Sequence, residues 1–378
     1  MSAARRAKRD VGFGGSAARA RGVAPGTNTE TGPSSSRRLE ALIVAVNQAS
    51  DMRHWYTVTK EFQLASMQVC EACRGAHTVH LRVDGNIPKT LLPAPDAPRA
   101  NPEGGVSSRV PRLRVLRVTW ARPSVDLLSS PIDALAEVEE LCFSYNFNAS
   151  LKGRAWPSRL RVMEFIERSP FNQPIVGVAW PASLQQLTFG ASFDQAIDRV
   201  TWPTSLQQLT LGRSFSHPIE GVTWPTFLQQ LKLGLSFNLT IEAVKWPVNL
   251  QYLEFGDAFN QPIKDVMWPA SLQQVKFGHD FDHPIEGDVL PSSLLQVTFG
   301  ADFDQAIDGV KWPKTLQRLT FWDAFNQPIT GVTWPMSLQH LTFWGEFDQS
   351  IEGSVLPRSL LELSFGPYFN QPVERVAW

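Results

Sequence analysis

Hydrophobic positions recur every 22 residues through the carboxy-terminal two thirds of the chain. Each unit opens on a Trp-Pro or Leu-Pro pair, and the units begin at Trp180, Trp202, Trp224, Trp246, Trp268, Leu290, Trp312, Trp334 and Leu356. Counted from this Trp or Leu as repeat position 1, apolar residues occupy positions 5, 8, 10, 14, 18 and 21. A fixed period of roughly 20 to 50 residues is typical of a solenoid, in which each unit stacks only on its neighbours.

Each unit predicts one short strand. Leu187 and Phe189 alternate with Gln186 and Thr188, which is the period of a half-buried strand. Proline at repeat position 2, and often at position 17, prevents the remainder from forming an α-helix. The predicted fold is therefore a repeat solenoid, a leucine-rich-repeat-like β coil with non-helical returns and a parallel sheet on its concave face.

The chain divides into four segments. Residues 1–37 form a basic, disordered tail, and residues 38–76 a small helical module. Residues 77–133 contain irregular first coils, with strands at 77–83 and 113–120 separated by a Pro-rich loop, and residues 134–378 form the regular solenoid. The array stops at Trp378, where the next unit would begin, so the last strand is expected to present an exposed edge.

The repeat resembles a known family. LTFG at 187–190 and FNQPI at 171–175, 259–263 and 325–329 are similar to FNIP repeats, a short variant of the leucine-rich repeat. The resemblance covers about 134–378, although this chain uses Trp-Pro where Ile-Pro or Leu-Pro is commoner. It implies protein–protein recognition without catalysis, often with an amino-terminal F-box.

Residues 38–76 carry two helical patterns, one from Leu39 to Val46 and one from Trp55 to Ala65. Their size and position resemble an F-box, which implies docking on a cullin-ligase adaptor subunit. The Leu-Pro pair that usually opens that motif is missing. The alternative is a helical cap that shields the first coil of the solenoid.

Charge is unevenly distributed along the chain. Residues 1–38 contain eight basic and two acidic residues, a net charge of +6, and the whole chain has −1, so the remainder carries −7. The start fits a solvated tail, an organelle transit peptide or a nuclear localisation patch. An acidic solenoid is a poor nucleic-acid binder. Three cysteines and the lack of a long apolar run indicate an intracellular protein, cytoplasmic or nuclear, with no membrane span.

The sequence predicts no catalytic residues, no cofactor and no metal. Cys70 and Cys73 precede His77 and His80, but the spacing leaves no room for a zinc finger, so these residues are expected to belong to a helix and a strand. Position 15 is Asp or Asn in most units, including Asp194. We expect these side chains to form a ladder of hydrogen bonds with backbone amides of the next coil, in preference to a calcium site.

Candidate partner-binding residues are those that depart from the repeat at positions 7, 9 and 11, which are predicted to face the concave side and are mostly Gln, Thr and Gly. The exceptions, counted together with neighbours at positions 12 and 13, are Arg318, Trp322, Asp323, His340, Trp344, Glu346 and Glu362, with a second patch of Tyr252, Glu254, Lys276 and His279. Trp beside Arg is typical of interface hot spots. The alternative is that Trp322 and Trp344 stack on each other and cover the sheet.

The predicted function is protein–protein recognition on the concave face. If residues 38–76 are an F-box, the chain is a substrate-recognition adaptor for a ubiquitin ligase. The competing function is a scaffolding repeat protein with no ubiquitin link.

Overall fold

The computed structural model describes residues 55–58, 79–83, 115–120, 138–143 and 147–373. Its strands form one parallel sheet of 14 strands, in which sequence order equals spatial order. The strands are β1 Trp55–Val58, β2 Val79–Val83, β3 Val115–Trp120, β4 Glu140–Phe143, β5 Val162–Phe165, β6 Gln186–Thr188, β7 Gln208–Thr210, β8 Gln230–Lys232, β9 Tyr252–Glu254, β10 Gln274–Lys276, β11 Gln296–Thr298, β12 Arg318–Phe321, β13 His340–Phe343 and β14 Glu362–Phe365.

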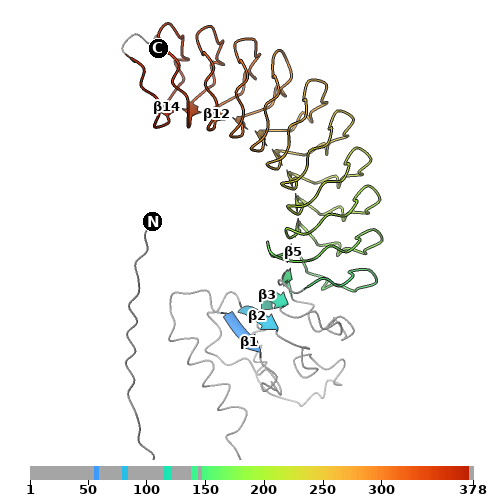
Figure 1. Ribbon diagram of the computed structural model, residues 1–378. Helices are drawn as coiled ribbons and strands as arrows, with labels where there is room; N and C mark the ends of the chain where they lie inside the picture. Colours follow the sequence, from blue (N-terminus) through green and yellow to red (C-terminus); the bar gives the residue numbers. More distant parts are fainter. Residues whose placement is uncertain (1–54, 59–78, 84–114, 121–137, 144–146, 374–378) are drawn as a thin grey trace, which may run out of the picture.

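The described coils form an arc with the strands on its inner side and the returning loops outside, as Figure 1 shows. From β5 to β14, each strand pairs with the next at the same repeat position, as in Gln186↔Gln208↔Gln230. This register keeps equivalent side chains in rows that run across the coils. The predicted solenoid with a concave parallel sheet is confirmed.

In the described coils from β5 to β14, turns and not helices return the chain to the next strand. The Leu at position 5 donates its N–H to the Pro carbonyl at position 2, as in Leu184 to Pro181 at 3.1 Å. The Val at position 21 does the same to the Ile at position 18, as in Val200 to Ile197 at 3.2 Å. Proline at position 2 fixes the backbone where the first turn begins, whereas the second turn forms also without a neighbouring proline, as after Ala196.

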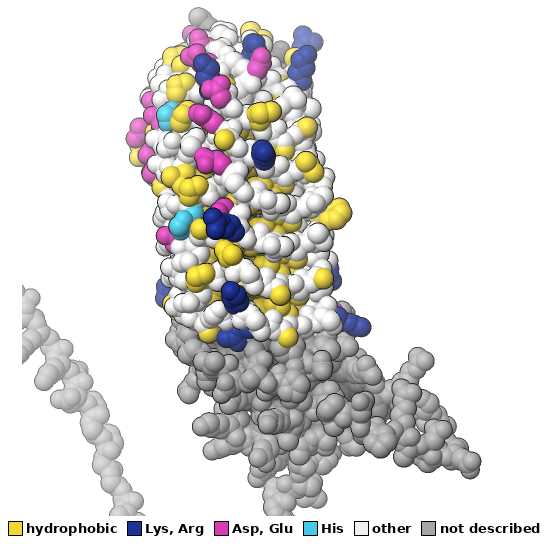
Figure 2. Space-filling model, turned by 90° about the vertical axis from the view of Figure 1, so that its right-hand side faces the viewer, with side chains coloured by type: hydrophobic (Ala, Val, Ile, Leu, Met, Phe, Trp, Pro, Cys, Tyr) yellow, Lys and Arg dark blue, Asp and Glu magenta, His cyan; other side chains and the backbone are white. Residues whose placement is uncertain are grey.

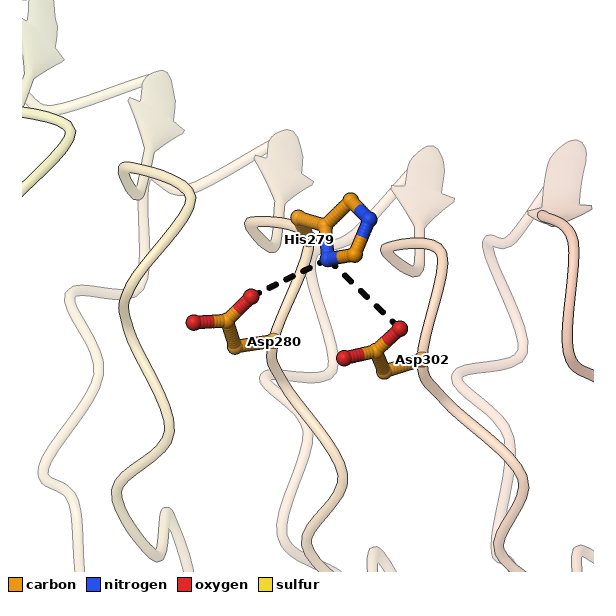
Figure 3. A group of neighbouring side chains, drawn as sticks. All are labelled: His279, Asp280 and Asp302. Carbon is orange, nitrogen blue, oxygen red and sulfur yellow. Dashed lines mark hydrogen bonds and ion pairs between the residues drawn. The ribbon is translucent and has the colours of Figure 1, made fainter.

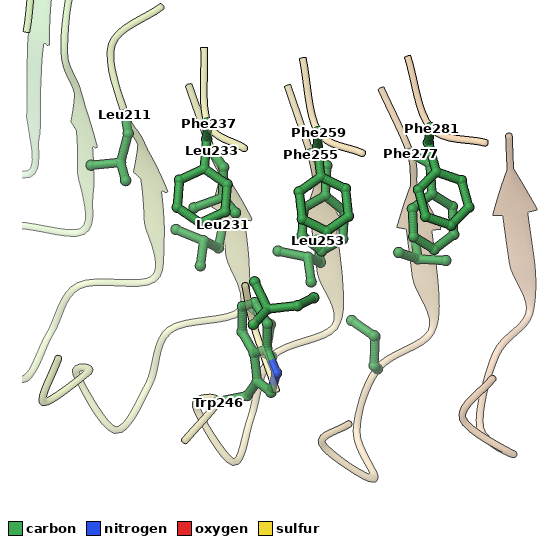
Figure 4. Close-up of a cluster of buried hydrophobic side chains, with 14 of the residues drawn as sticks. Leu211, Leu231, Leu233, Phe237, Trp246, Leu253, Phe255, Phe259, Phe277 and Phe281 are labelled. Carbon is green, nitrogen blue, oxygen red and sulfur yellow. The ribbon is translucent and has the colours of Figure 1, made fainter. Parts of the chain in front are cut away.

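The core is a continuous stack of apolar side chains inside the coils. Phe259 and Phe281 at position 14 are fully buried and stack with their ring centroids 6.1 Å apart. Phe255 at position 10 lies 4.1 Å from Phe259, so two columns of rings run side by side (Figure 4). Burying one such ring contributes about 1.5–3 kcal/mol, and each coil repeats the contribution.

The predicted polar ladder is also confirmed. Asn172 Oδ1 accepts the backbone N–H of Asp194 at 2.9 Å and the side-chain N–H of Gln195 at 2.8 Å. The same bond recurs 22 residues later from Ser216 to Asp194 and, farther along, from Asp348 to Asn326. The ladder satisfies loop amides that would otherwise be unpaired beside the core.

The predicted helix is wrong at residues 55–58, where the structure has strand β1 paired in parallel with β2. All four residues, Trp55, Tyr56, Thr57 and Val58, are aromatic or β-branched, and these types favour strands. The rest of 38–76 and the tail 1–37 lie outside the described residues. The predicted strands within 77–83 and 113–120 are confirmed as β2 and β3.

Candidate functional site

Side chains at positions 7 and 9 of the strands face the concave side, because the apolar residue at position 8 between them is buried. In β6, Gln186 and Thr188 are half-buried while Leu187 is 1% exposed. Strands β7 and β11 repeat this Gln and Thr pattern. Two groups of strands depart from it, β8 to β10 and β12 to β14.

Position 11 was predicted to face the concave side, and its glycines do not. Its glycines are buried from coil to coil and do not line the concave surface. A Cβ at Gly300 would lie 1.6 Å from the carbonyl oxygen of Gly278, so stacked backbones leave no room for a side chain there. Glycine is therefore required by the close approach of neighbouring coils.

Trp322 and Trp344, here called the Trp pair, occupy position 11 in two adjacent coils and are exposed. Their strands continue one residue farther than β6 to β11, and the Trp344 N–H donates to the Phe321 carbonyl at 2.9 Å. The longer ladder turns position 11 outward, in the same alternation as positions 7 and 9. The two indoles stack with centroids 5.9 Å apart and remain 41% and 45% exposed.

The Trp pair shares its strands with a row of polar residues at position 7. Strand register aligns Arg318, His340 and Glu362 across β12 to β14. His340 Nδ1 lies 3.1 Å from Glu362 Oε2, and Ser364 donates to the other carboxylate oxygen. These hydrogen bonds, first from His340, lower the pKa of Glu362. Arg318 and Asp323 are exposed.

The second predicted patch lies on β8 to β10 and contains a residue that the sequence analysis missed. Glu254 bonds Lys232 and Lys276, each at 2.9 Å, and accepts a hydrogen bond from Tyr252 at 2.7 Å. Lys232 Nζ also lies 5.5 Å from the centre of the Tyr252 ring. Lys232 could have been found, because it replaces Thr at position 9 one coil before Glu254.

The charged groups of this patch form ion pairs and hydrogen bonds mainly with one another. Burial raises the pKa of Glu254, but hydrogen bonds from Lys276, Lys232 and Tyr252 outweigh it and lower the pKa to about 2. Burial, with the bond to Glu254, raises the pKa of Tyr252. A carboxylate held between two lysines stiffens the sheet more than it offers a free binding group.

His279, predicted with the second patch, instead lies on the turn after β10 with two acids (Figure 3). Its Nδ1 is 3.0 Å from Asp280 Oδ1 and 3.5 Å from Asp302 Oδ1. The bond to Asp280 and the charges of Asp302, Asp280 and Asp257 raise the pKa of His279. One ligand atom from each of His279, Asp280 and Asp302 lies within 4.8 Å of the others, and all three side chains are exposed.

Exposed acids continue along the same margin of the coils; the sequence analysis named Asp323 and Glu346 but did not identify the row they belong to. The acidic edge, as we call it, consists of Asp257, Asp280, Asp302, Asp323 and Glu346 at positions 12 or 13. On the outer side of the arc, acidic side chains likewise gather along one margin of the carboxy-terminal coils (Figure 2). The signal was available as one acid per unit at these positions. The predicted Cys70, Cys73 and His77 lie outside the described residues, as does the side chain of His80.

The short parallel strands, the turn returns and the stacked polar ladder define a solenoid of the leucine-rich-repeat type. The model of the family described as FNIP Repeat matches this chain at residues 171–214, 246–280, 259–302, 281–324, 325–368 and 347–375. The chain therefore contains FNIP repeats in these segments. A repeat solenoid of this type is consistent with protein–protein interaction.

Solved structures with related coils include three leucine-rich-repeat or similar proteins. CroV588, described as a novel circular LRR protein, is 28% identical to this chain. The match covers 79% of this chain and 51% of the CroV588 chain, with a TM-score of 0.44. Toll from Drosophila, in its complex with Spatzle, is 13% identical over 68% of this chain and 40% of its own, with a TM-score of 0.47. An internalin from Listeria monocytogenes is 12% identical over 63% of this chain and 87% of its own, with a TM-score of 0.39.

The chain spans about half the length of CroV588 and less of Toll. No curated protein matches the chain. Within the described residues, no helix has the length and apolar character needed to cross a bilayer.

Proposed function

We propose that this solenoid recognises a protein partner through its concave face, with the Trp pair as the anchor. The observation that carries the proposal is the exposure of two stacked indoles where six other coils have a buried glycine. Large aromatic side chains are costly to leave in water and are enriched among interface hot spots. Arg318, Asp323, His340 and Glu362 would supply the polar contacts around this anchor.

The Tyr252 patch, with Lys276, would make a weaker contribution to the same surface. Its members already bond to one another, so a partner gains less by pairing with them. Within this proposal the chain is a binding protein and not an enzyme, because leucine-rich-repeat folds typically bind. We also propose an intracellular setting, since three cysteines in 378 residues suit a reducing compartment.

The test compares partners retrieved from an extract of the source cells by the full chain and by Trp322→Gly with Trp344→Gly. Both substitutions restore the residue found at position 11 in the other coils, so the coil geometry is retained. Quantitative mass spectrometry should show a specific partner lost from the double variant, by about tenfold or more for a hot-spot pair.

A matched control removes exposed apolar side chains elsewhere. Met267→Ser with Met336→Ser alters residues that are 81% and 74% exposed and lie outside the strands. The control should retain the partner. A partner that binds all three forms equally would rule out the Trp pair as the anchor.

A narrower proposal makes the chain a substrate-recognition adaptor for a ubiquitin ligase. Its support is the resemblance of residues 38–76 to an F-box, and strand β1 within that segment weakens this support. The competing proposal is a scaffolding repeat protein. Retrieval of a cullin-ligase adaptor subunit by the full chain, and its loss when Leu39, Leu42 and Ile43 are replaced by Ser, would favour the adaptor. Failure to retrieve that subunit would favour the scaffold.

A further inference from the structure

The outer faces of the Trp pair are not covered by equivalent side chains. Trp322 and Trp344 stack on each other, and the coils on either side carry Gly300 and Gly366 at the same repeat position. A glycine has no side chain to lie over the neighbouring indole. Each indole therefore keeps one face available, and the face of Trp attracts cations more strongly than that of any other side chain.

The Trp pair is flanked by acids on the side of positions 12 and 13, while Arg318 and His340 lie at position 7 of the same strands. Asp302, Asp323 and Glu346 are exposed at positions 12 or 13 of the coils that contain β11, β12 and β13, directly after position 11. Among the described residues, no Lys or Arg forms an ion pair with any member of the acidic edge, and His279 alone contacts two of them. A cationic partner would thus meet Asp323 and Glu346, which no described Lys, Arg or His pairs, while Asp302 already lies 3.5 Å from His279.

The spacing of the coils suits an extended chain laid across them. The indoles lie 5.9 Å apart, and the rings at position 14 are separated by 6.0–6.1 Å. In an extended segment, alternate side chains lie about 6.6–6.8 Å apart on one face. Every second residue of such a segment can therefore face one coil, and flexible Lys or Arg side chains absorb the small mismatch.

We propose that the partner segment recognised at the Trp pair is extended and basic, with Lys or Arg at alternate positions. One cationic side chain stacks on an outer indole face, and the next ones pair with Asp302, Asp323 and Glu346. This inference rests on the proposed function and adds the chemistry of the partner. The repeated geometry of the coils supplies the spacing, while the two Trp residues and the acids supply the selectivity.

The probe is a fluorescein-labelled nine-residue peptide with Arg at every second position and Ser between. A second peptide of the same composition carries its arginines in one block. Fluorescence anisotropy with the full chain, in the presence of EDTA to exclude metal bridging, should give severalfold tighter binding of the alternating peptide. Raising the salt concentration should weaken binding, because exposed charges are screened.

Three chain variants locate the binding. Asp302→Asn, Asp323→Asn and Glu346→Gln together should weaken the alternating peptide about tenfold, as expected for three exposed ion pairs. The matched control Asp265→Asn, Asp308→Asn and Glu286→Gln makes the same change in net charge on the outer side of the coils and should change affinity less than about twofold. Trp322→Gly with Trp344→Gly should also weaken binding about tenfold.

If the acidic-edge variant and its matched control lose peptide affinity equally, net charge alone explains the binding and the inference is overturned. It is also overturned if the Trp322→Gly with Trp344→Gly variant binds the peptide as tightly as the native chain. Tighter binding after Arg5, Arg6, Lys8 and Arg9 are replaced by Gln would assign the surface to the chain's own basic start instead of a partner. If the extract partner requires the Trp pair but neither peptide binds, the basic segment is wrong and the proposed function stands. If that partner ignores the Trp pair, both fall.

Discussion

At the scale of single residues, the polar ladder at position 15 has one gap. Ser216 occupies this position, and its side chain is too short to continue the ladder to Asn238 in the next coil. On either side the ladder resumes, from Asn172 to Asp194 and from Asn238 to Asn260. The gap is a local fault that a single substitution can repair.

We expect Ser216→Asn to stabilise the chain by about 0.5–1.5 kcal/mol, the usual net value of one hydrogen bond. The Oδ1 of the new Asn would accept a hydrogen bond from the backbone N–H of Asn238. In the next coil, Asn238 Oδ1 accepts the backbone N–H of Asn260 in the same way, at 2.9 Å. Urea unfolding measures the change. Ser214→Asn, exposed at position 13 of the same coil, is the control and should have no effect. Equal unfolding midpoints for Ser216→Asn and the native chain would contradict the ladder's role.

Position 11 shows where sequence reasoning stops. The repeat identified Trp322 and Trp344 as exceptions, and both side chains are exposed. It could not show that Gly300 is buried, because burial there depends on how closely two backbones stack and not on side-chain polarity. The acidic edge was missed for a related reason, since its members alternate between two repeat positions.

At the scale of the strands, β6 to β11, with glycine at position 11, have three residues, and β12 and β13, with tryptophan there, have four. We expect Gly300→Ala to destabilise the chain by about 3 kcal/mol or more, at the upper end for overpacking, since its Cβ would lie 1.6 Å from a backbone oxygen. Trp322→Ala, at the same position one coil later, should cost less than about 1 kcal/mol because that side chain is exposed. Chemical unfolding of both variants tests this order, and similar losses would refute it.

Glu254 gives the central strands a dependence on pH. Its pKa falls from 4.5 to about 2 in the folded chain, so the ionised carboxylate contributes stability above pH 4.5. That contribution is lost as the pH falls from 4.5 through about 2. Glu254→Gln, which keeps the shape, should therefore be less stable than the native chain near neutral pH and approach it at low pH. A stability difference that stays constant with pH would show that Glu254 is not held ionised by its lysines.

The sequence predicted the strands best where the repeat is regular. From β6 to β13, fixed apolar positions determine which residues enter the sheet. Strand β1 was missed because Trp55 and Val58 also fit a helical period, and four residues cannot distinguish the two periods. Pairing with β2 supplies the long-range information that the local pattern lacks.

At the scale of the whole molecule, the arc is a chain of nearest-neighbour contacts. Each described strand pairs only with the strands next to it, and the rings at position 14 stack from one coil to the next. Stability in such an array is a sum of coil and interface terms, so damage in one coil spreads only a short distance. The concave surface around the Trp pair therefore depends mainly on the coils from β11 to β14.

We expect Phe303→Ala to show this locality. Phe303 is fully buried and stacks on Phe281 and Phe325 at 6.0 and 6.1 Å, so its removal should cost about 3–5 kcal/mol. Hydrogen exchange followed by mass spectrometry should accelerate across β10 to β12 and stay unchanged in β6 and β7, because no contact links those strands directly to the cavity. Ser292→Ala, exposed in the same coil, should leave exchange unaltered. Uniform acceleration along the arc would mean that the coils unfold as one cooperative unit, and peptide binding at the Trp pair would then fail with any core substitution, however distant.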